Sequence, residues 1–418
     1  MTRKKDEVKL TRSGVRHGSL RRSSSWANAG KAVLTGVLTL ALSGVAVGAY
    51  AALSLVNEVN TVDLPAGPNA VAAGSQSIDG EFAIMLVGSD SRNGQSINDG
   101  ETGELNDVNL VLYVSEDHKN ATVISFPRDL MVPIPSCPGP NGEPNYYSAM
   151  SSQQINSTLS SGGLPCVVMT VEQLSGLDIN YAGLITFDGV IAMSNAIGGV
   201  KVCLTAPIVD PNTDLDLPAG NVTLKGKKAL QFLRTRHGVG DGGDKSRISN
   251  QQVFMSAMIR KLKSAETLSN PVTVYALANA GLKNMLLSSN MANVQFLQAL
   301  AGTVKDIDLN RINFVQYPTV TDPAQPGRLV PDSVNGPALM KLVKSGKPFT
   351  VKSLGTGVVD KDKNGDSGTS TDPGTGTDKG SDTKNGSKDG KGTEADSPGN
   401  TPGQSAAEQT CSAGRTVY

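Results

Sequence analysis

Three stretches of the chain decide the fold: FAIMLVGSDSR at residues 82–92, DVNLVLYV at residues 107–114 and ATVISFPRD at residues 121–129. Each contains a short, mainly apolar run next to turn residues, which is the pattern of a buried β-strand. We therefore expect strands over residues 82–87, 108–114 and 121–126. In every stretch the strand meets charged side chains at one end, so the segments that predict a sheet also predict a polar site.

Strands and helices alternate through the rest of this region. Apolar spacing predicts one more strand and four helices, at residues 200–204 and at residues 167–174, 187–197, 229–233 and 251–262. The mixture indicates an α/β fold, namely a three-layer α-β-α domain with a central mixed sheet. We place this domain at residues 81–350, with a motif-bearing core at residues 81–263.

Upstream of the domain, the chain changes from basic to apolar. Residues 1–31 carry nine lysines and arginines against Asp6 and Glu7, and residues 32–56 carry no charge. A run of about 20 apolar residues is long enough to cross a bilayer as a helix, and basic residues stay on the cytoplasmic side. We therefore predict a cytoplasmic segment at 1–31, a transmembrane helix at 32–56 and an extracytoplasmic domain held at the cell membrane.

Two further interpretations of this apolar run stay open. Ala49 and Ala51 flank Tyr50 in the small-x-small pattern of a signal-peptide cleavage site, although the apolar run continues beyond it. Gly44 and Gly48 have the GxxxG spacing of a helix-pairing face, although glycine is common in membrane helices generally. An uncleaved single anchor is the interpretation that the length of the run favours.

The segments that flank the domain are polar. We expect residues 57–80 to be an extracytoplasmic spacer and residues 351–405 to be a disordered tail rich in Gly, Ser, Thr, Asp and Lys. Such a tail buries too little apolar surface to offset the entropy lost on ordering. Residues 406–418 form a last segment that contains a cysteine. The formal net charge of zero argues against a nucleic-acid-binding protein.

Four cysteines lie on the predicted exported side, where disulfides persist: Cys137, Cys166, Cys203 and Cys411. They allow three complete pairings, and the sequence does not choose among them. No two of them have the CxxC spacing, which argues against a zinc or redox site. Structural disulfides are the role that we expect.

Acidic and basic side chains gather at the predicted strand and helix ends. Asp90 and Asp107 offer oxygen ligands that suit a hard divalent cation such as Mg²⁺. Arginine binds phosphate well because its planar guanidinium can make two parallel hydrogen bonds. Four arginines occupy such positions: Arg128, Arg234, Arg236 and Arg247. Each motif alone can also be explained as a turn, a surface ion pair or a solvated helix end. Because the motifs occur together at strand ends of a predicted α/β sheet, they favour phosphoryl transfer.

The chain resembles the LytR-CpsA-Psr family of bacterial cell-wall enzymes. The resemblance rests on a series of motifs in the family's order: LVGSDSR, LNDVNLVLYV, VISFPRDLMVPIP, INSTLSSGG, TVEQLSGLDINY, SNAIGGVKVCL, LPAG, GKKALQFLRTRHG and DKSRISNQQ. It covers residues 81–263, with a looser match to about residue 350. It implies a phosphotransferase that moves a wall polymer from a polyprenyl diphosphate carrier to a peptidoglycan hydroxyl, leaving a phosphodiester link. The polymer (teichoic acid, capsule, arabinogalactan or another glycan) and the oligomeric state stay open.

The resemblance also implies roles for individual residues. The family's metal-binding aspartates fall on Asp90 and Asp107, which would hold Mg²⁺ or Mn²⁺, and one of the two would accept the proton of the acceptor hydroxyl. Catalysis would then involve Asp90, Asp107 and Arg128. The residues that would bind the diphosphate are Arg92, Arg128, Arg234, Arg236, Arg247 and Gln251.

Two positions depart from the family's pattern. Many relatives have an arginine where this chain has Leu105 and a lysine where it has Gln154, so two positive charges are missing. A non-catalytic protein that binds wall polymer or carrier lipid therefore stays an alternative, as does a polyprenyl diphosphate hydrolase. A serine hydrolase is disfavoured because no GxSxG motif occurs. Residues 184–191 and 253–262 are expected to wall a lipid pocket or else to form ordinary core.

Overall fold

The structure is a computed structural model that describes residues 59–65, 78, 80–97, 103–264, 267, 270–292, 294–361, 394–399 and 401–415. The chain divides into two compact units, Met1–Leu53 and Ser54–Tyr418, and all described residues belong to the second. No helix among them combines the length and the apolar character that a membrane crossing needs. The predicted cytoplasmic segment at 1–31 and transmembrane helix at 32–56 lie outside the described residues.

A mixed sheet forms the centre of the described chain, with the strand order β1-β12-β7-β2-β3-β4-β13-β19. Its strands are β1 (Asn60–Val62), β2 (Phe82–Ser89), β3 (Asn106–Val114), β4 (Ala121–Phe126), β7 (Tyr181–Ile185), β12 (Met285–Ser288), β13 (Ile312–Gln316) and β19 (Gly403–Ser405). β2 and β4 run antiparallel to β3, while β7 runs parallel to β2 and β13 parallel to β4. The carboxyl ends of β2, β4, β7 and β13 therefore meet at one edge. The predicted α/β fold with a central mixed sheet is confirmed.

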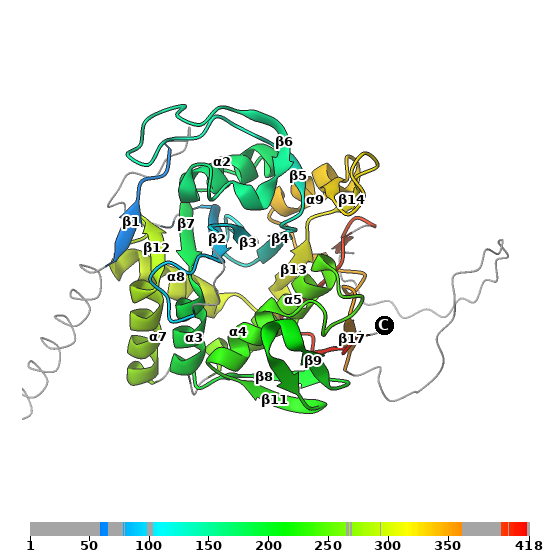
Figure 1. The fold of residues 1–418 in the computed structure, drawn as a ribbon. Coiled ribbons are helices and arrows are strands. Elements are labelled where there is room, and N and C mark those ends of the chain that lie inside the picture. The colour runs from blue at the N-terminus through cyan, green and yellow to red at the C-terminus, as the bar shows by residue number, and fades with distance from the viewer. Residues whose placement is uncertain are drawn as a thin grey trace, which may run out of the picture. The chain divides into compact units, whose positions relative to one another are not determined.

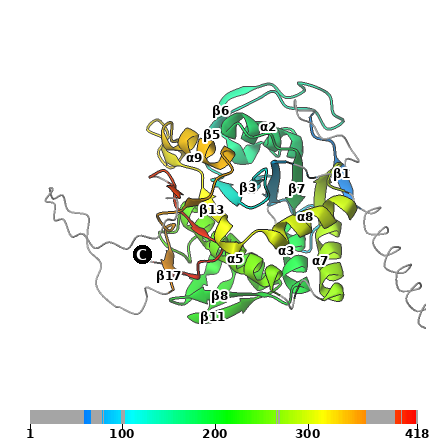
Figure 2. The ribbon, with the colours of Figure 1, turned by 180° about the vertical axis from the view of Figure 1, so that it is seen from behind.

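Helices cover both faces of this sheet (Figures 1 and 2). They are α2 (Gly163–Ser175), α3 (Phe187–Ala196), α4 (Lys227–Arg234), α5 (Asp244–Lys263), α7 (Pro271–Lys283), α8 (Val294–Asp306) and α9 (Asn335–Lys344). On one face, Val168 of α2 and Leu339 of α9 pack with Met85 and Ile124 of the sheet. On the other, Phe296 of α8 packs in a second core beside the sheet. Because both faces are covered, β4 is buried along its whole length.

A smaller sheet with the order β11-β8-β20-β17 packs against α4 and α5. Its strands are β8 (Val200–Leu204), β11 (Gly220–Leu224), β17 (Val358–Asp360) and β20 (Thr410–Ser412). Phe254 of α5 faces this sheet's core, whereas Ile259 of α5 packs against the core of the central sheet. α5 thus lies between two cores, and the apolar residues of 253–262 pack in them. Because α5 packs against the cores of both sheets, its polar first turn is held in position relative to them.

Shorter elements complete the described chain. The two-stranded ribbons are β5 (Met131–Ile134) with β6 (Met150–Gln154), β9 (Ile208–Asp210) with β10 (Leu215–Leu217), β14 (Thr319–Thr321) with β15 (Leu329–Pro331), and β16 (Phe349–Thr350) with β18 (Ala395–Asp396). Single 3₁₀ turns are η1 (Ile155–Ser157), η2 (Pro211–Thr213) and η3 (Leu309–Arg311). The β14–β15 hairpin matters for the site because its second strand reaches the Pro127-Arg128-Asp129 motif.

The structure selects one of the three cysteine pairings that the sequence left open. Cys137 bonds to Cys166 across 29 residues, and Cys203 bonds to Cys411 across 208 residues. In the chain-entropy treatment, closing loops of these lengths removes about 3.6 and about 5 kcal/mol of unfolded-state freedom. The second disulfide joins β8 to β20, so it fastens the end of the chain to the sheet beneath α5.

The predicted disordered tail at residues 351–405 is wrong at both ends. β17, β18 and β19 lie within it, and residues 362–393 lie outside the described part of the chain. Polar backbone pairing and side-chain hydrogen bonds replace the apolar burial that the segment lacks: Gln404 Nε2 donates to Gln252 O and to Ser256 Oγ, both at 2.9 Å. Gly403 suits this close approach, because a Cβ there would lie 2.0 Å from Phe314 O.

The predicted spacer at residues 57–80 also contains structure. Residues Asn60–Val62 form β1, which pairs parallel with β12 at the edge of the central sheet. Its sequence, NTV, is too short to show a strand period, so the pairing partner decides its conformation. The described domain therefore begins before residue 81.

Candidate active site

The candidate site lies where β2 and β4 end and β3 begins. Asp90 follows β2, and the main chains pair through a hydrogen bond from Asp90 N to Leu105 O at 3.1 Å. Leu105 N in turn donates to Asp90 Oδ1 at 2.7 Å. Leu105 therefore holds Asp90 through its backbone, whatever its side chain. Asp107 stands two residues further on, within β3, which brings both predicted carboxylates to the same edge.

Asp107 is the centre of what we call the inner cluster, which consists of Asp107, Arg128, Asp244 and Arg247. Arg128 Nη1 donates to Asp107 Oδ1 at 2.7 Å. Arg247 Nη2 donates to the Asp107 main-chain oxygen at 2.8 Å, and its Nη1 lies 3.5 Å from Asp107 Oδ2. Burial raises the pKa of Asp107, but the charges of Arg247 and Arg128 outweigh it and hold that pKa below its ordinary value. Asp107 therefore stays ionised.

The first turn of α5 supplies the other half of the inner cluster. Asp244 Oδ1 lies 2.7 Å from Arg247 Nη2 and 3.7 Å from Arg128 Nε. The side chains of Asp244 and Arg247 are only 6% and 4% exposed, so their charges depend on each other. An acidic residue in the first turn also complements the helix dipole. Asp244 was not among the predicted site residues, although it begins the DKSRISNQQ motif that pointed to Arg247.

Asp90 is half-buried, and its pKa is shifted in the direction opposite to that of Asp107. Burial raises its pKa above the ordinary value, and the negative charge of Asp107 adds to this, against the lowering effect of the Leu105 hydrogen bond and of Arg92 and Arg128. Two carboxylates at one edge thus have pKa values pushed apart. Such a pair is a recurrent feature of sites in which one acid stays charged and another exchanges a proton.

Arg92 and Arg234 form what we call the outer pair, because both guanidinium groups lie over the ring of Phe187. Their Cζ atoms are 4.9 and 4.6 Å from the ring centroid. Arg92 Nη1 also donates to the main-chain oxygen of Asp90. The sequence placed Phe187 only within residues 184–191, as part of a lipid-pocket wall or of ordinary core, and not as a partner of the arginines. Its ring contacts two cations that come from separate elements, the loop after β2 and the end of α4.

The main chain at Arg236 is held in place by Asp210. Asp210 Oδ2 accepts hydrogen bonds from Thr235 Oγ1 at 2.6 Å and from Arg236 N at 3.3 Å. Burial and the neighbouring charge of Arg128 lower the pKa of Arg236. Its Nε is buried and has no hydrogen-bond partner among the described residues. An incoming anion would satisfy this cation.

Gln251, predicted to bind diphosphate, instead donates through Nε2 to Leu233 O at 2.9 Å. The neighbouring Asn250 Nδ2 donates to Phe232 O at 2.8 Å. Both amides thus satisfy carbonyls in the last turn of α4, directly before Arg234. In this structure Gln251 supports the arginines and does not itself reach toward the carboxylates.

Asp129 contacts two further residues. Gln154 stands where many relatives have a lysine, and Arg328 was not among the predicted site residues. Gln154 Nε2 donates to Asp129 Oδ1 at 2.9 Å. Arg328 Nη1 donates to the same oxygen at 3.0 Å from a position 199 residues away. No local signal marks Arg328, which lies in a loop between two short strands.

A divalent cation fits the carboxylates only with help from other ligands. No group of three or more His, Cys, Asp or Glu side chains in the described ranges is arranged to hold a metal ion. The two acids lie near each other, because Asp90 is hydrogen-bonded to Leu105, which stands two residues before Asp107. Mg²⁺ commonly binds one or two carboxylates and completes its octahedral shell with water and substrate phosphate. The donor set therefore suits Mg²⁺ or Mn²⁺ bound together with a phosphate.

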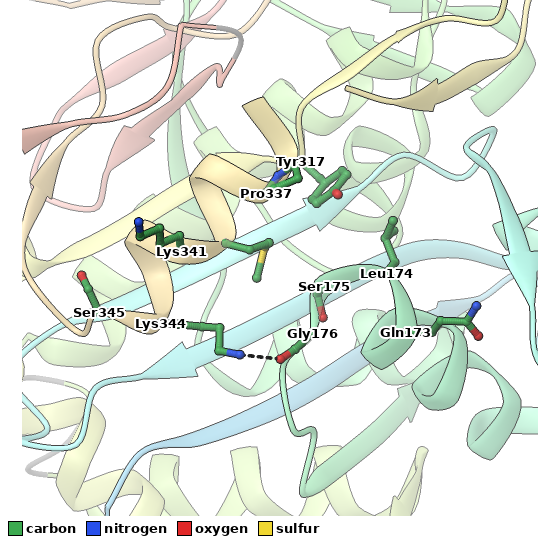
Figure 3. A pocket seen from close by; sticks show the side chains of 10 residues that line it. Gln173, Leu174, Ser175, Gly176, Tyr317, Pro337, Lys341, Lys344 and Ser345 are labelled. Carbon is green, nitrogen blue, oxygen red and sulfur yellow. Dashed lines mark hydrogen bonds between the residues drawn. The ribbon is translucent and has the colours of Figure 1, made fainter. Parts of the chain in front are cut away.

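An open hollow of about 690 Å³ lies elsewhere, between α2 and α9 (Figure 3). Tyr317 and Met340 form part of its lining, and no predicted site residue does. Lys344 Nζ donates across it to Gly176 O at 2.8 Å, at the end of α2. Because a lysine at that end complements the helix dipole, the contact is structural.

The structure is thus an α/β domain that gathers carboxylates and arginines at one sheet edge, and arginine side chains there have the chemistry to bind phosphate. The LytR_cpsA_psr family profile matches residues 49–334. This is more than half of the chain, and the chain belongs to the LytR_cpsA_psr family.

Individual relatives give this assignment detail. Cell wall biosynthesis protein LcpA of Corynebacterium glutamicum is 28% identical over 294 residues, which cover 64% of this chain and 56% of that protein. The polyisoprenyl-teichoic acid–peptidoglycan teichoic acid transferase TagT of Bacillus subtilis is 26% identical over 296 residues, 68% of this chain and 85% of that protein. The chain spans about half the length of the corynebacterial relatives.

A solved structure carries the same fold. The LytR-Csp2A-Psr enzyme from Actinomyces oris aligns with a TM-score of 0.52 and 21% identity, covering 69% of this chain and 96% of that chain. At this identity the likeness establishes the fold, and the chemistry of the present chain has to be argued from its own side chains.

Proposed function

We propose that this protein is a membrane-anchored phosphotransferase of cell-wall assembly. It transfers a glycan or anionic wall polymer from a polyprenyl diphosphate carrier to a hydroxyl of peptidoglycan and forms a phosphodiester link. Two supports are independent of each other: the chain belongs to a family that includes a named teichoic acid transferase, and its sheet edge gathers the charges that this chemistry needs.

The observation that carries the proposal is the gathering of several arginines around Asp107 at one sheet edge. Arg128 and Arg247 are arranged around Asp107 within hydrogen-bonding reach, and Arg236 adds a partly buried cation whose Nε has no hydrogen-bond partner among the described residues. A diphosphate brings at least two negative charges, which a site of this kind would neutralise. Preorganised cations of this type accelerate reactions because they stabilise the charge that develops on the transferred phosphate.

The proposed reaction is a substitution at phosphorus. The acceptor oxygen attacks the phosphorus atom that bears the glycan, and the bond from that phosphorus to the bridging oxygen of the diphosphate breaks. Polyprenyl phosphate leaves, and the glycan phosphate is now esterified to peptidoglycan. Arg128, Arg236 and Arg247 would hold the phosphate oxygens, and Arg92 and Arg234 would contact the second phosphate or the glycan from the Phe187 side.

The hydroxyl proton has to pass to a base on the protein. Asp90 suits this role better than Asp107, because Asp107 accepts a hydrogen bond from the charged Arg128, whereas Asp90 accepts one from the neutral main-chain N–H of Leu105. Asp90 and Asp107 would also hold Mg²⁺ or Mn²⁺, which when bound neutralises phosphate charge. The proposed anchor at residues 32–56 would keep the domain on the outer side of the cell membrane, where its lipid carrier and peptidoglycan lie.

The proposal is tested with the full-length chain in detergent, a short-chain polyprenyl diphosphate glycan, Mg²⁺ and a peptidoglycan acceptor. Asp107→Asn and Arg128→Gln should lose product formation by about 100-fold or more, the loss typical of removing one preorganised charge contact. Asp396→Asn, which alters an exposed ion pair with Lys352, is the matched control and should retain activity. Polyprenyl phosphate release without a linked product would support a hydrolase, and binding without either product would support a non-catalytic protein.

A further inference from the structure

We infer that Arg328 is a positioning residue of the same site, because it holds the charge of Asp129 away from Arg128. This inference rests on the proposed function, since it concerns how the phosphate-binding arginines are kept available. Arg328 reaches Asp129 from a hairpin that no motif of the sequence marks.

The backbone places Arg328 firmly. Leu329 N donates to the main-chain oxygen of Asp129 at 3.3 Å, and Leu329 forms a parallel bridge with Leu130. Within the loop, Arg328 N donates to Gln325 O at 3.0 Å. The β14–β15 hairpin is therefore joined to the main chain that directly follows Arg128, so the guanidinium of Arg328 is delivered to Asp129 by regular backbone pairing.

Asp129 divides its two oxygens between different partners. Oδ1 accepts hydrogen bonds from Arg328 Nη1 at 3.0 Å and from Gln154 Nε2 at 2.9 Å, whereas Oδ2 lies 3.7 Å from Arg128 Nε. Gln154 is neutral, so Arg328 supplies the positive charge on the Oδ1 side. Arg128 remains free to point its Nη1 at Asp107, 2.7 Å away.

Loss of the Arg328 charge would change the site in two ways. Asp129, whose side chain is only 17% exposed, would keep Arg128 as its remaining cationic partner and draw it away from the phosphate. The site would also lose one positive charge in a partly desolvated place, where charges act more strongly than in water. Both changes weaken the binding of an anion.

Arg311 provides a matched control for this arginine. Its side chain is 38% exposed, as is that of Arg328, and its Nη1 lies 2.8 Å from Glu394 Oε1. Arg311 belongs to η3 and contacts no residue of the site. A substitution there removes an equally exposed arginine and its ion pair but leaves Asp129 unchanged.

The test measures the dissociation constant of geranyl diphosphate with Mg²⁺ by calorimetry, using the full-length chain. Arg328→Gln should weaken binding by about tenfold, the loss typical of a charge-assisted hydrogen bond. Arg328→Lys, and the double variant Arg328→Gln with Gln154→Lys, should both bind within about threefold of the wild type, because each returns a cation to Asp129 Oδ1. Arg311→Gln should bind as the wild type does.

The outcomes separate the two proposals. If the wild type binds geranyl diphosphate and Arg328→Gln binds it equally well, the role of Arg328 is overturned and the proposed function still stands. A loss that the double variant does not restore, with all variants folded by circular dichroism, also overturns it, because the charge was then not what mattered. Absence of binding by the wild type itself removes both proposals.

Discussion

The inner cluster and the outer pair use the same side chain, arginine, in opposite environments. In the inner cluster Arg247 and Asp244 are almost completely buried and depend on each other for their charge balance. In the outer pair Arg92 and Arg234 rest on the ring of Phe187, partly in contact with solvent. We therefore expect the arginines of the inner cluster to contribute both to the stability of the fold and to binding of the proposed diphosphate. Those of the outer pair should contribute mainly to that binding.

The physical reason lies in desolvation. A buried ion pair loses its hydration on folding, so removal of one partner leaves an uncompensated charge and costs about 3–5 kcal/mol. A half-solvated guanidinium over an aromatic ring contributes about 0.5–1 kcal/mol. The comparison therefore yields an ordered set of expectations, from the centre of the site outward.

The largest effect is expected for Arg247→Gln. This change removes the buried one of the two cations that Asp244 and Asp107 share, and the free energy of unfolding should fall by about 3–5 kcal/mol. Urea unfolding followed by circular dichroism measures it. Lys227→Gln, which removes an exposed ion pair with Asp214, is the control and should change stability by less than about 0.5 kcal/mol. Equal stabilities of the two variants would contradict the dependence of the inner cluster on burial.

The next largest effect is expected for the double variant Cys203→Ser with Cys411→Ser. The disulfide fastens β20, whose Ser412 Oγ donates to Asn250 Oδ1 on α5, the helix that carries Asp244 and Arg247. Its loss should lower the free energy of unfolding by about 2–5 kcal/mol and loosen the inner cluster more than the outer pair.

Hydrogen exchange measured by mass spectrometry tests this difference. Amides of the first turns of α5 should exchange faster in the double variant, while those around Phe187 keep their rates. The matched comparison is Cys137→Ser with Cys166→Ser, whose disulfide does not contact α5. Faster exchange at both places, or at neither, would show that the C-terminal strand does not hold the inner cluster selectively.

A smaller, pH-dependent effect separates Asp107 from Asp90. The folded-state pKa of Asp107 is lowered, so its ionised form stabilises the fold above the unfolded-state value of about 3.9, and this stabilisation is lost as pH falls through the lowered pKa. The folded-state pKa of Asp90 is raised, so its ionised form costs stability at neutral pH, and the cost disappears as pH falls through the raised pKa.

In EDTA at pH 7, Asp107→Asn should therefore destabilise the fold, whereas Asp90→Asn should leave it equally or more stable. The stability of each variant relative to the wild type, followed from pH 7 down to about pH 3, should change at higher pH for Asp90→Asn than for Asp107→Asn. Asp396→Asn controls for an exposed carboxylate. Identical pH dependences for the two site variants would contradict the opposite pKa shifts.

The smallest effect is expected in the outer pair. Arg234→Gln should weaken binding of geranyl diphosphate by about two- to fivefold, which corresponds to about 0.5–1 kcal/mol, and should leave stability almost unchanged. Arg128→Gln, measured in parallel by calorimetry, should weaken binding further. A loss for Arg234→Gln as large as that for Arg128→Gln would place the phosphate beside Phe187 instead of beside Asp107.

Much of the fold could be read from short apolar runs. Residues 82–87 and 121–126 predicted strands because each is a mainly apolar run, which is a local property of the sequence. The structure shows that both strands are largely buried, as such runs require. The carboxylates Asp90 and Asp107 were found because they lie beside the predicted strands at residues 82–87 and 108–114. The predictions that went wrong concern polar segments such as 351–405, whose order comes from hydrogen bonds to distant partners and leaves no apolar pattern.

The sequence by itself determined four of the strands, the motif residues and the family, because these depend on residues that are near one another along the chain. Only the tertiary structure decided that Arg328 reaches Asp129, that Phe187 carries Arg92 and Arg234, and that Cys411 returns to Cys203. Each of these contacts joins segments far apart in sequence through sheet pairing or side-chain packing. Since no local periodicity encodes such contacts, they become visible only once the chain is folded.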